Sequence, residues 1–233
     1  MKKTLLTVAL AAAFLPNFAF AEEGDWVVRL RAVNVSPNDS SRLGKTVNKN
    51  VLAGAMTPSA GLKVDDNVIP EFDISYYLTK NIAAELILAL GTKHDVKIRG
   101  DSAGIIGNQN LGDVTLLPPT LTLQWHFRPD QTFDPYIGAG INYTRMRDRK
   151  LKFKSGATAG DKIKIENDSW GLAAQAGFDV NLKDGWMINA DVKYIMIDTD
   201  VKMKGPITNY AWTKIDSRDI DPWVIGIGIG KRF

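Results

Sequence analysis

Hydrophobic and polar residues alternate along eight segments of the chain, a period that is typical of β-strands with one apolar and one polar face. We predict these strands at residues 25–35, 70–79, 82–91, 114–127, 135–145, 169–182, 186–198 and 222–233. The pattern is clearest in the sixth segment, where Trp170, Leu172 and Phe178 lie on one face. Gln175 and Asp179 lie on the other face. The chain is therefore predicted to be all-β.

The connections between these segments alternate between long and short. The long ones are residues 36–69, 92–113, 146–168 and 199–221, and the short ones are 79–81, 128–134 and 183–185. Outer-membrane barrels combine long outer loops with short periplasmic turns. An even number of strands also closes the sheet, so no open edge meets lipid. We predict an eight-stranded antiparallel transmembrane β-barrel over residues 22–233, with both termini in the periplasm.

Aromatic residues near the strand ends favour this barrel over a soluble β-sandwich, which would alternate in a similar way. Two aromatic girdles match the two interfaces of a membrane. One predicted rim carries Trp26, Trp125, Phe127, Tyr136, Trp186 and Phe233, and the other carries Tyr143, Trp170 and Trp223. The terminal Phe233 also resembles the signal that is read by the barrel-insertion machinery.

The first 21 residues have the features of a secretory signal peptide. Lys2 and Lys3 precede an apolar run at 5–15, and a small-x-small cleavage site ends at Ala21. This run is too short and wrongly flanked for a membrane-spanning helix. No later stretch reaches the ~20 consecutive apolar residues that such a helix needs. We predict that residues 1–21 are cleaved.

The amino-acid composition limits which bonds, metal sites and partners the protein can have. The chain has no cysteine, so disulfides and thiolate metal sites are excluded. Lys and Arg number 29 against 26 Asp and Glu, a near balance that gives no reason to expect nucleic acid as a partner. Its two histidines are far apart: His94 is predicted in a loop, and His126 faces inward with no serine beside it. We expect no enzymatic activity, catalytic residue, metal or other cofactor.

The inward face of the predicted barrel carries charges of both signs near the periplasmic end. The interior of an eight-stranded barrel is narrow, and buried charges are tolerated only when they are paired. We expect a polar floor that plugs the barrel, whether or not it takes part in transport. Its candidate members are Arg29, Arg31, Glu85, His126, Asp179, Asp191 and Arg232.

Nearer the outer end the inward residues become apolar, which suits an apolar ligand better than a water channel. The candidates for this apolar pocket are Val33, Ile87, Ala89, Leu116, Ile195, Ile197 and Val224. Alternatively, these side chains fill the barrel and leave no cavity. Pro118 and Pro119 lie inside a strand and lack the N–H groups of the ladder. They indicate either a lateral gap in the wall or a local kink.

Five ordered motifs resemble the OmpW family of small outer-membrane proteins. They are LPPTL at 117–121 followed by Gln124-Trp125, PYIGAGINYT at 135–144, DSWGLA at 168–173, IDT at 197–199 and DPWV at 221–224. The resemblance implies an eight-stranded barrel for small, mainly hydrophobic molecules that leave sideways into the bilayer at Pro118-Pro119. The sequence departs from the family at Lys193, where an aromatic residue is common. We expect Lys193 to point inward, where it pairs with Asp191 or Glu85 or extends its ammonium group toward water.

Three functions stay open at this point. The first is passage of small hydrophobic or amphiphilic molecules. The second is a structural or adhesive barrel with a solid interior, and the third is passage of small polar solutes, which Lys193 favours. The expected partners are outer-membrane lipids, the small ligand and the insertion machinery. Lysines at 150–154 and 162–165 are expected to meet anionic lipopolysaccharide.

Overall fold

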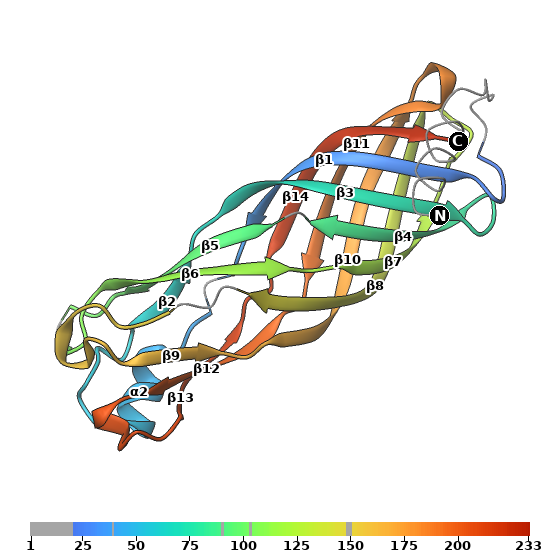
Figure 1. Cartoon of the computed structure of the whole chain (residues 1–233). Helices are drawn as coiled ribbons and strands as arrows, with labels where there is room; N and C mark the ends of the chain where they lie inside the picture. The colour runs from blue at the N-terminus through green and yellow to red at the C-terminus, as the bar shows by residue number, and fades with distance from the viewer. Residues whose placement is uncertain (1–20, 39, 90, 103, 148–150) are drawn as a thin grey trace, which may run out of the picture.

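Eight antiparallel strands form a closed barrel, as predicted (Figure 1). The computed structural model describes residues 21–233 except 39, 90, 103 and 148–150, so residues 1–20 of the predicted signal peptide lie outside the described residues. The wall strands are β1 (Trp26–Ser36), β3 (Asn67–Tyr77), β4 (Ile82–Ala89), β7 (Thr120–His126), β8 (Phe133–Arg147), β10 (Asp168–Asn181), β11 (Trp186–Ile195) and β14 (Trp223–Arg232).

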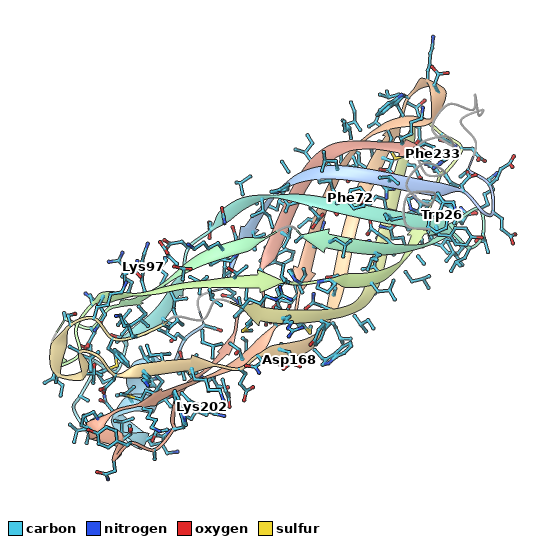
Figure 2. The ribbon with its side chains drawn as sticks, viewed as in Figure 1. Trp26, Phe72, Lys97, Asp168, Lys202 and Phe233 are labelled. Carbon is cyan, nitrogen blue, oxygen red and sulfur yellow. The ribbon has the colours of Figure 1, made fainter. Side chains whose placement is uncertain are left out.

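Each wall strand pairs with its neighbours in chain order, and the first pairs with the last. The β1–β14 ladder runs from Val27↔Arg232 to Ser36↔Trp223, and the β8–β10 ladder joins the two ends of the remaining sheet. Backbone hydrogen bonds between Trp26 and Phe233 place the start of β1 and the end of the chain together (Figure 2). We call this the terminal end of the barrel.

The long connections fold into a cap at the opposite end. The cap contains α2 (Leu43–Asn50), β2 (Gly61–Val64), β5 (Thr92–Arg99), β6 (Gln109–Leu117), β9 (Lys162–Ile165), β12 (Asp198–Lys204) and β13 (Thr213–Asp219), with short 3-10 turns at Gly156–Thr158 and Pro206–Thr208. A third 3-10 turn, Lys183–Gly185, joins β10 to β11 at the terminal end. Strands β2, β5 and β6 extend the barrel sheet, whereas β9, β12 and β13 form a second sheet. One apolar core runs without interruption from the upper barrel into the cap.

The predicted strand 114–127 is in fact two strands, because the prolines interrupt the ladder on one side. Pairing with β8 continues across them, since Pro119 O accepts a hydrogen bond of 3.1 Å from the Tyr143 N–H. Pairing with β4 stops at Ile87↔Thr120, and pairing with β5 starts at Thr92↔Leu116. Within the described residues, no pairing joins 88–91 to 117–119. We call this interruption the Pro118 seam.

The outward face of the wall is apolar and ends in two aromatic rims. Exposed residues include Leu123, Ile137, Leu172 and Ile227, as a surface in contact with lipid requires. Aromatic pairs with tilted rings mark the rims: Trp26–Tyr76 at the terminal end, and Tyr143–Trp170 and Tyr194–Trp223 toward the cap. Tyr136 was predicted in the girdle, but it is buried inside the barrel because its strand places it on the inward face. Among the described residues, no helix is long and apolar enough to cross a membrane.

Candidate functional site

Arg31 is the centre of a buried ion-pair network that fills the middle of the barrel. Its guanidinium lies 2.8 Å from Asp73 and 2.9 Å from Glu85, and it also pairs with Asp191. It donates a further hydrogen bond of 3.0 Å to Asn189. These side chains are almost completely buried and come from four strands of the wall. The network therefore ties distant strands together across the interior of the barrel.

Arg29 forms the next layer toward the terminal end. Its Nη2 atom lies 2.7 Å from Asp179, and its Nη1 atom donates to Ser75 Oγ at 2.8 Å. Above it, Glu85 also accepts hydrogen bonds of 2.8 Å from Gln124 and 2.9 Å from Gln175. Because each carboxylate has charged or amide donors, the cost of burying it is offset.

Lys193 covers this network on the side that faces the cap. Its ammonium nitrogen lies 2.7 Å from both Asp191 and Glu71, and its side chain is 1% exposed. Of the alternatives predicted for Lys193, pairing with Asp191 is confirmed, and Glu71 is a second partner that the sequence analysis did not indicate. The charge of the Lys193 ammonium is compensated by these two ion pairs, so Lys193 does not present an unpaired charge to the space between the network and the cap.

Two members of the predicted polar floor lie nearest the terminal end. Arg232 was expected to pair with an acid, but its described partners are the Tyr77 hydroxyl at 3.2 Å, the Tyr77 ring and the Pro129 carbonyl. The prediction is wrong because the nearby acids have other partners: Asp179 pairs with Arg29, and Asp134 accepts from the Arg128 N–H and contacts His126. His126 contacts Asp134 at 2.7 Å.

His126, Asp134 and Asp179 have ligand atoms within 4.8 Å of one another, a spacing that a metal ion could use. Asp179, however, already pairs with Arg29, whose charge opposes a second cation there. The cluster is therefore better described as part of the ion-pair network.

Above the network lies an apolar cavity of about 30 Å³. All the predicted pocket residues line it, namely Val33, Ile87, Ala89, Leu116, Ile195, Ile197 and Val224. Pro118 and Ala89 belong to the same lining, so the cavity borders the Pro118 seam. A volume of this size holds roughly one or two water molecules. In this conformation the upper lumen is therefore nearly filled by its own side chains.

The Pro118 seam lies at the level of the aromatic rim toward the cap. Pro119 pairs with Tyr143, and the Tyr143 ring lies 4.8 Å from the ring of Trp170. Trp170 is among the most exposed aromatic residues, at 67%. Since aromatic girdles sit at the membrane interface, the seam faces the boundary between lipid tails and headgroups.

Sequence reasoning missed several residues of this interior. Strand β3 supplies Glu71, Asp73 and Ser75, whose alternation with Phe72 and Ile74 was a signal that could have placed them on the inward face. His94 was predicted in a loop, which is wrong: it lies on β5, is 1% exposed, and lines the apolar cavity. The alternation of His94, Val96 and Ile98 with charged residues was a local signal for this strand, but its pairing with β2 and β6 arises only in the folded chain.

A second site lies on the outside of the barrel, just beyond the aromatic rim. It is a surface groove of about 690 Å³ that we call the basic groove. Its lining consists of Arg145, Arg147, Lys162, Lys164, Met146, Leu151, Ile163, Ile165, Asn167 and Trp212. The four cationic side chains are exposed, and within the described chain they form no ion pair. The groove thus combines unpaired positive charge with apolar walls.

The groove next to it has mixed charge. It is lined by Lys164, Glu166, Asn167, Asp168, Asp200 and Lys202. Partial burial raises the pKa of Asp200, but hydrogen bonds from Lys214 and Ser217 outweigh that effect and hold the pKa below its usual range. Asp200 is therefore ionised at neutral pH and offsets nearby lysines, so of these two grooves the basic groove has the more concentrated positive charge.

Comparison with known proteins places these features in context. Residues 22–233 match the OmpW family. Outer membrane protein W of Vibrio cholerae is 36% identical over the whole length of both chains. The crystal structure of OprG from Pseudomonas aeruginosa superposes with a TM-score of 0.77 at 32% identity, over 93% of this chain and 99% of that one. A P. aeruginosa protein named dibenzothiophene metabolism operon protein PahQ is 28% identical over 94% of this chain and 93% of its own length.

Proposed function

The chain belongs to the OmpW family of outer-membrane β-barrels, and from this premise we propose that it passes small, mainly hydrophobic molecules from outside the cell into the bilayer. The molecule enters the apolar upper lumen, meets the charged network below it, and leaves sideways through the Pro118 seam. The terminal end faces the periplasm, and the cap faces the outside.

The observation that carries this proposal is that the apolar cavity shares its lining with the interrupted ladder. Ala89 and Pro118 belong both to the cavity wall and to the seam. An interrupted ladder leaves backbone polar groups unpaired, and each such group costs several kcal/mol in hydrocarbon unless something covers it. A costly interruption at this height is explained if it serves as an exit.

The buried network supports a lateral route over a route through the floor. Arg31 and Lys193 are held by several carboxylates at hydrogen-bond distance. Opening a water path would have to break many of these contacts together. This argues against a channel for polar solutes, although the presence of Lys193 in the sequence favoured such a channel.

One relative is consistent with an apolar cargo. The name of PahQ ties that protein to the metabolism of dibenzothiophene, a flat apolar heterocycle. A molecule of that size exceeds the present cavity of about 30 Å³, so passage requires the lining side chains to move apart. The small volume favours one alternative, a structural or adhesive barrel with a solid interior.

The two prolines provide an experiment with an internal control. In an antiparallel strand the N–H and C=O of one residue point toward the same neighbour. Pro119 points toward β8, because its carbonyl accepts from Tyr143, so Pro118 points toward the seam. Pro118→Val restores an N–H on the seam, whereas Pro119→Val restores one on the intact side.

We expect Pro118→Val to lower the uptake of naphthalene into whole cells that lack their own barrels of this family. Pro119→Val should leave that uptake at the parental value. Both variants should still show the heat-modified gel shift of a folded barrel. If Pro118→Val is folded and takes up naphthalene as fast as the parent, lateral exit at this seam is wrong. If the parent takes up no more than cells without the protein, the solid-barrel alternative takes its place.

The remaining partners follow from position and charge. The basic groove lies beyond the aromatic rim, with Arg145 and Arg147 two and four residues past Tyr143 on the same face of β8. At ~3.4 Å per residue this is the level of the headgroups, where the phosphates of lipopolysaccharide lie. We therefore propose the groove as a lipopolysaccharide site that includes Lys162 and Lys164. Phe233 is proposed as the contact for the insertion machinery, and no enzymatic activity is proposed.

A further inference from the structure

One polar atom of the apolar cavity has no partner. His94 is 1% exposed, and its ring lines the cavity together with the apolar residues. Its Nδ1 atom lies 2.9 Å from the carbonyl oxygen of Asp65. Its Nε2 atom is buried and makes no hydrogen bond. A buried polar atom without a partner costs about 1–3 kcal/mol, so its presence in an apolar site calls for an explanation.

The contact with Asp65 fixes the chemistry of the free nitrogen. A carbonyl oxygen only accepts hydrogen bonds, so Nδ1 must carry the proton. In the neutral imidazole Nε2 is then a pure acceptor. For this neutral form the missing partner is a donor, either an O–H or an N–H group.

The other polar groups of the lining are already satisfied. Glu71 accepts from Lys193 at 2.7 Å, and Thr120 Oγ1 accepts from Asn142 at 2.8 Å and donates to the Pro118 carbonyl at 3.1 Å. Among the described lining residues, His94 Nε2 is thus the buried side-chain atom that remains open to a ligand.

We propose that His94 selects apolar molecules that carry a single hydrogen-bond donor, such as aromatic or aliphatic alcohols, over the corresponding hydrocarbons. This inference rests on the proposed transport function and names its substrate class. The apolar body of the molecule lies against Ile87, Ile195 and Val224, and its hydroxyl donates to His94 Nε2. A hydrocarbon in the same position leaves that acceptor unpaired and is therefore held less well.

The test compares naphthol with naphthalene, which share one ring system and differ by a hydroxyl. Uptake of both is measured in whole cells that express the parent, His94→Leu or His94→Gln. Leucine removes the acceptor, whereas glutamine supplies a carbonyl acceptor in its place. Lys93→Gln is the matched control, because Lys93 precedes His94 on the strand and lies on the exposed face. A heat-modified gel shift verifies that every variant is folded.

We expect the ratio of naphthol to naphthalene uptake to fall about two- to tenfold in His94→Leu, the factor that corresponds to one hydrogen bond. His94→Gln should keep most of the ratio, and Lys93→Gln should keep all of it. A folded His94→Leu protein with the parental ratio would overturn the proposal. So would equal losses for both probes in that variant.

A binding measurement separates this proposal from that of transport. The chain has two histidines, so the imidazole nitrogens of isotope-labelled protein in detergent can be assigned with one variant. Naphthol should shift the Nε2 resonance of His94 and leave that of His126 unchanged, whereas naphthalene should shift neither. If uptake of both probes is independent of the protein but this shift appears, transport fails and the His94 site stands. If naphthol leaves the His94 resonance unchanged, the site itself is wrong.

Discussion

Replacing Arg31 by alanine should be the most damaging single change in the barrel interior. Its guanidinium contacts Asp73, Glu85 and Asp191 directly, and it lies 3.1 Å from Glu71. Alanine would leave these carboxylates facing one another in a space without solvent. Lys193 and Arg29 would remain as the nearest cations, and both already have acid partners of their own.

The size of the loss follows from the burial of the network. Removing one partner of a buried ion pair typically costs ~3–5 kcal/mol, because the remaining charge is left uncompensated. Arg31 serves several carboxylates, so we expect Arg31→Ala to reach at least the upper part of that range. Arg232→Ala should cost less, about 1–2 kcal/mol, since Arg232 contacts a hydroxyl, a ring and a carbonyl instead of an acid.

The assay is urea unfolding of the barrel folded in lipid vesicles, followed by the heat-modified gel shift. The midpoint for Arg31→Ala should fall well below that of the parent and below that of Arg232→Ala. Adding Asp73→Asn and Glu85→Gln to Arg31→Ala should recover part of the loss, because fewer charges remain unpaired. An Arg31→Ala midpoint equal to that of Arg232→Ala would show that the acids around Arg31 are hydrated, which would refute the reasoning.

Three further predictions concern the space above the network, the outer groove and the wall. Lys193→Met should lower the free energy of unfolding by ~3–5 kcal/mol. Adding Glu71→Gln to Lys193→Met should restore part of that stability and raise naphthalene uptake. An unchanged urea midpoint for Lys193→Met alone would contradict the prediction. The double variant Arg145→Gln/Arg147→Gln should bind lipopolysaccharide about tenfold or more weakly than the parent at low salt, in detergent, with Lys202→Gln as the control. Equal binding by the parent and the double variant would exclude the basic groove as the lipopolysaccharide site. Gly140→Ala should destabilise the barrel by ~1–3 kcal/mol, since its Cβ would lie 1.9 Å from the Leu121 carbonyl; a parental unfolding midpoint would show that the wall shifts freely.

The alternation along each strand was enough to predict the barrel and the orientation of most of its side chains. The reason is that successive residues of a strand point to opposite faces, so the period is a local property of the backbone. It placed Arg29, Arg31 and Asp179 inside and Leu172 outside without knowledge of the neighbours. The same local chemistry indicated an interruption at Pro118 and Pro119, because a missing N–H is visible in the sequence.

The pairing inside the barrel was decided only by the tertiary structure. Arg31 and Asp191 are separated by 160 residues, and their contact depends on the closure of the sheet and on its stagger. For the same reason the sequence did not indicate Glu71 as a partner of Lys193, and it predicted for Arg232 an acid that Arg232 does not contact. Which side of the prolines remains paired depended on where β4 ends and β5 begins.

The arrangement of the cap was beyond the reach of local patterns. Its strands are short, and they pair with segments far along the chain, as β9 does with β12. The ring of His94, which belongs to the cavity lining, bonds to the carbonyl of Asp65, 29 residues earlier in the chain. The sequence therefore determined which face of the wall each side chain occupies, because that depends on adjacent residues. The tertiary structure decided which buried groups meet and which atoms stay unpaired, because those contacts arise only when distant strands close into a barrel.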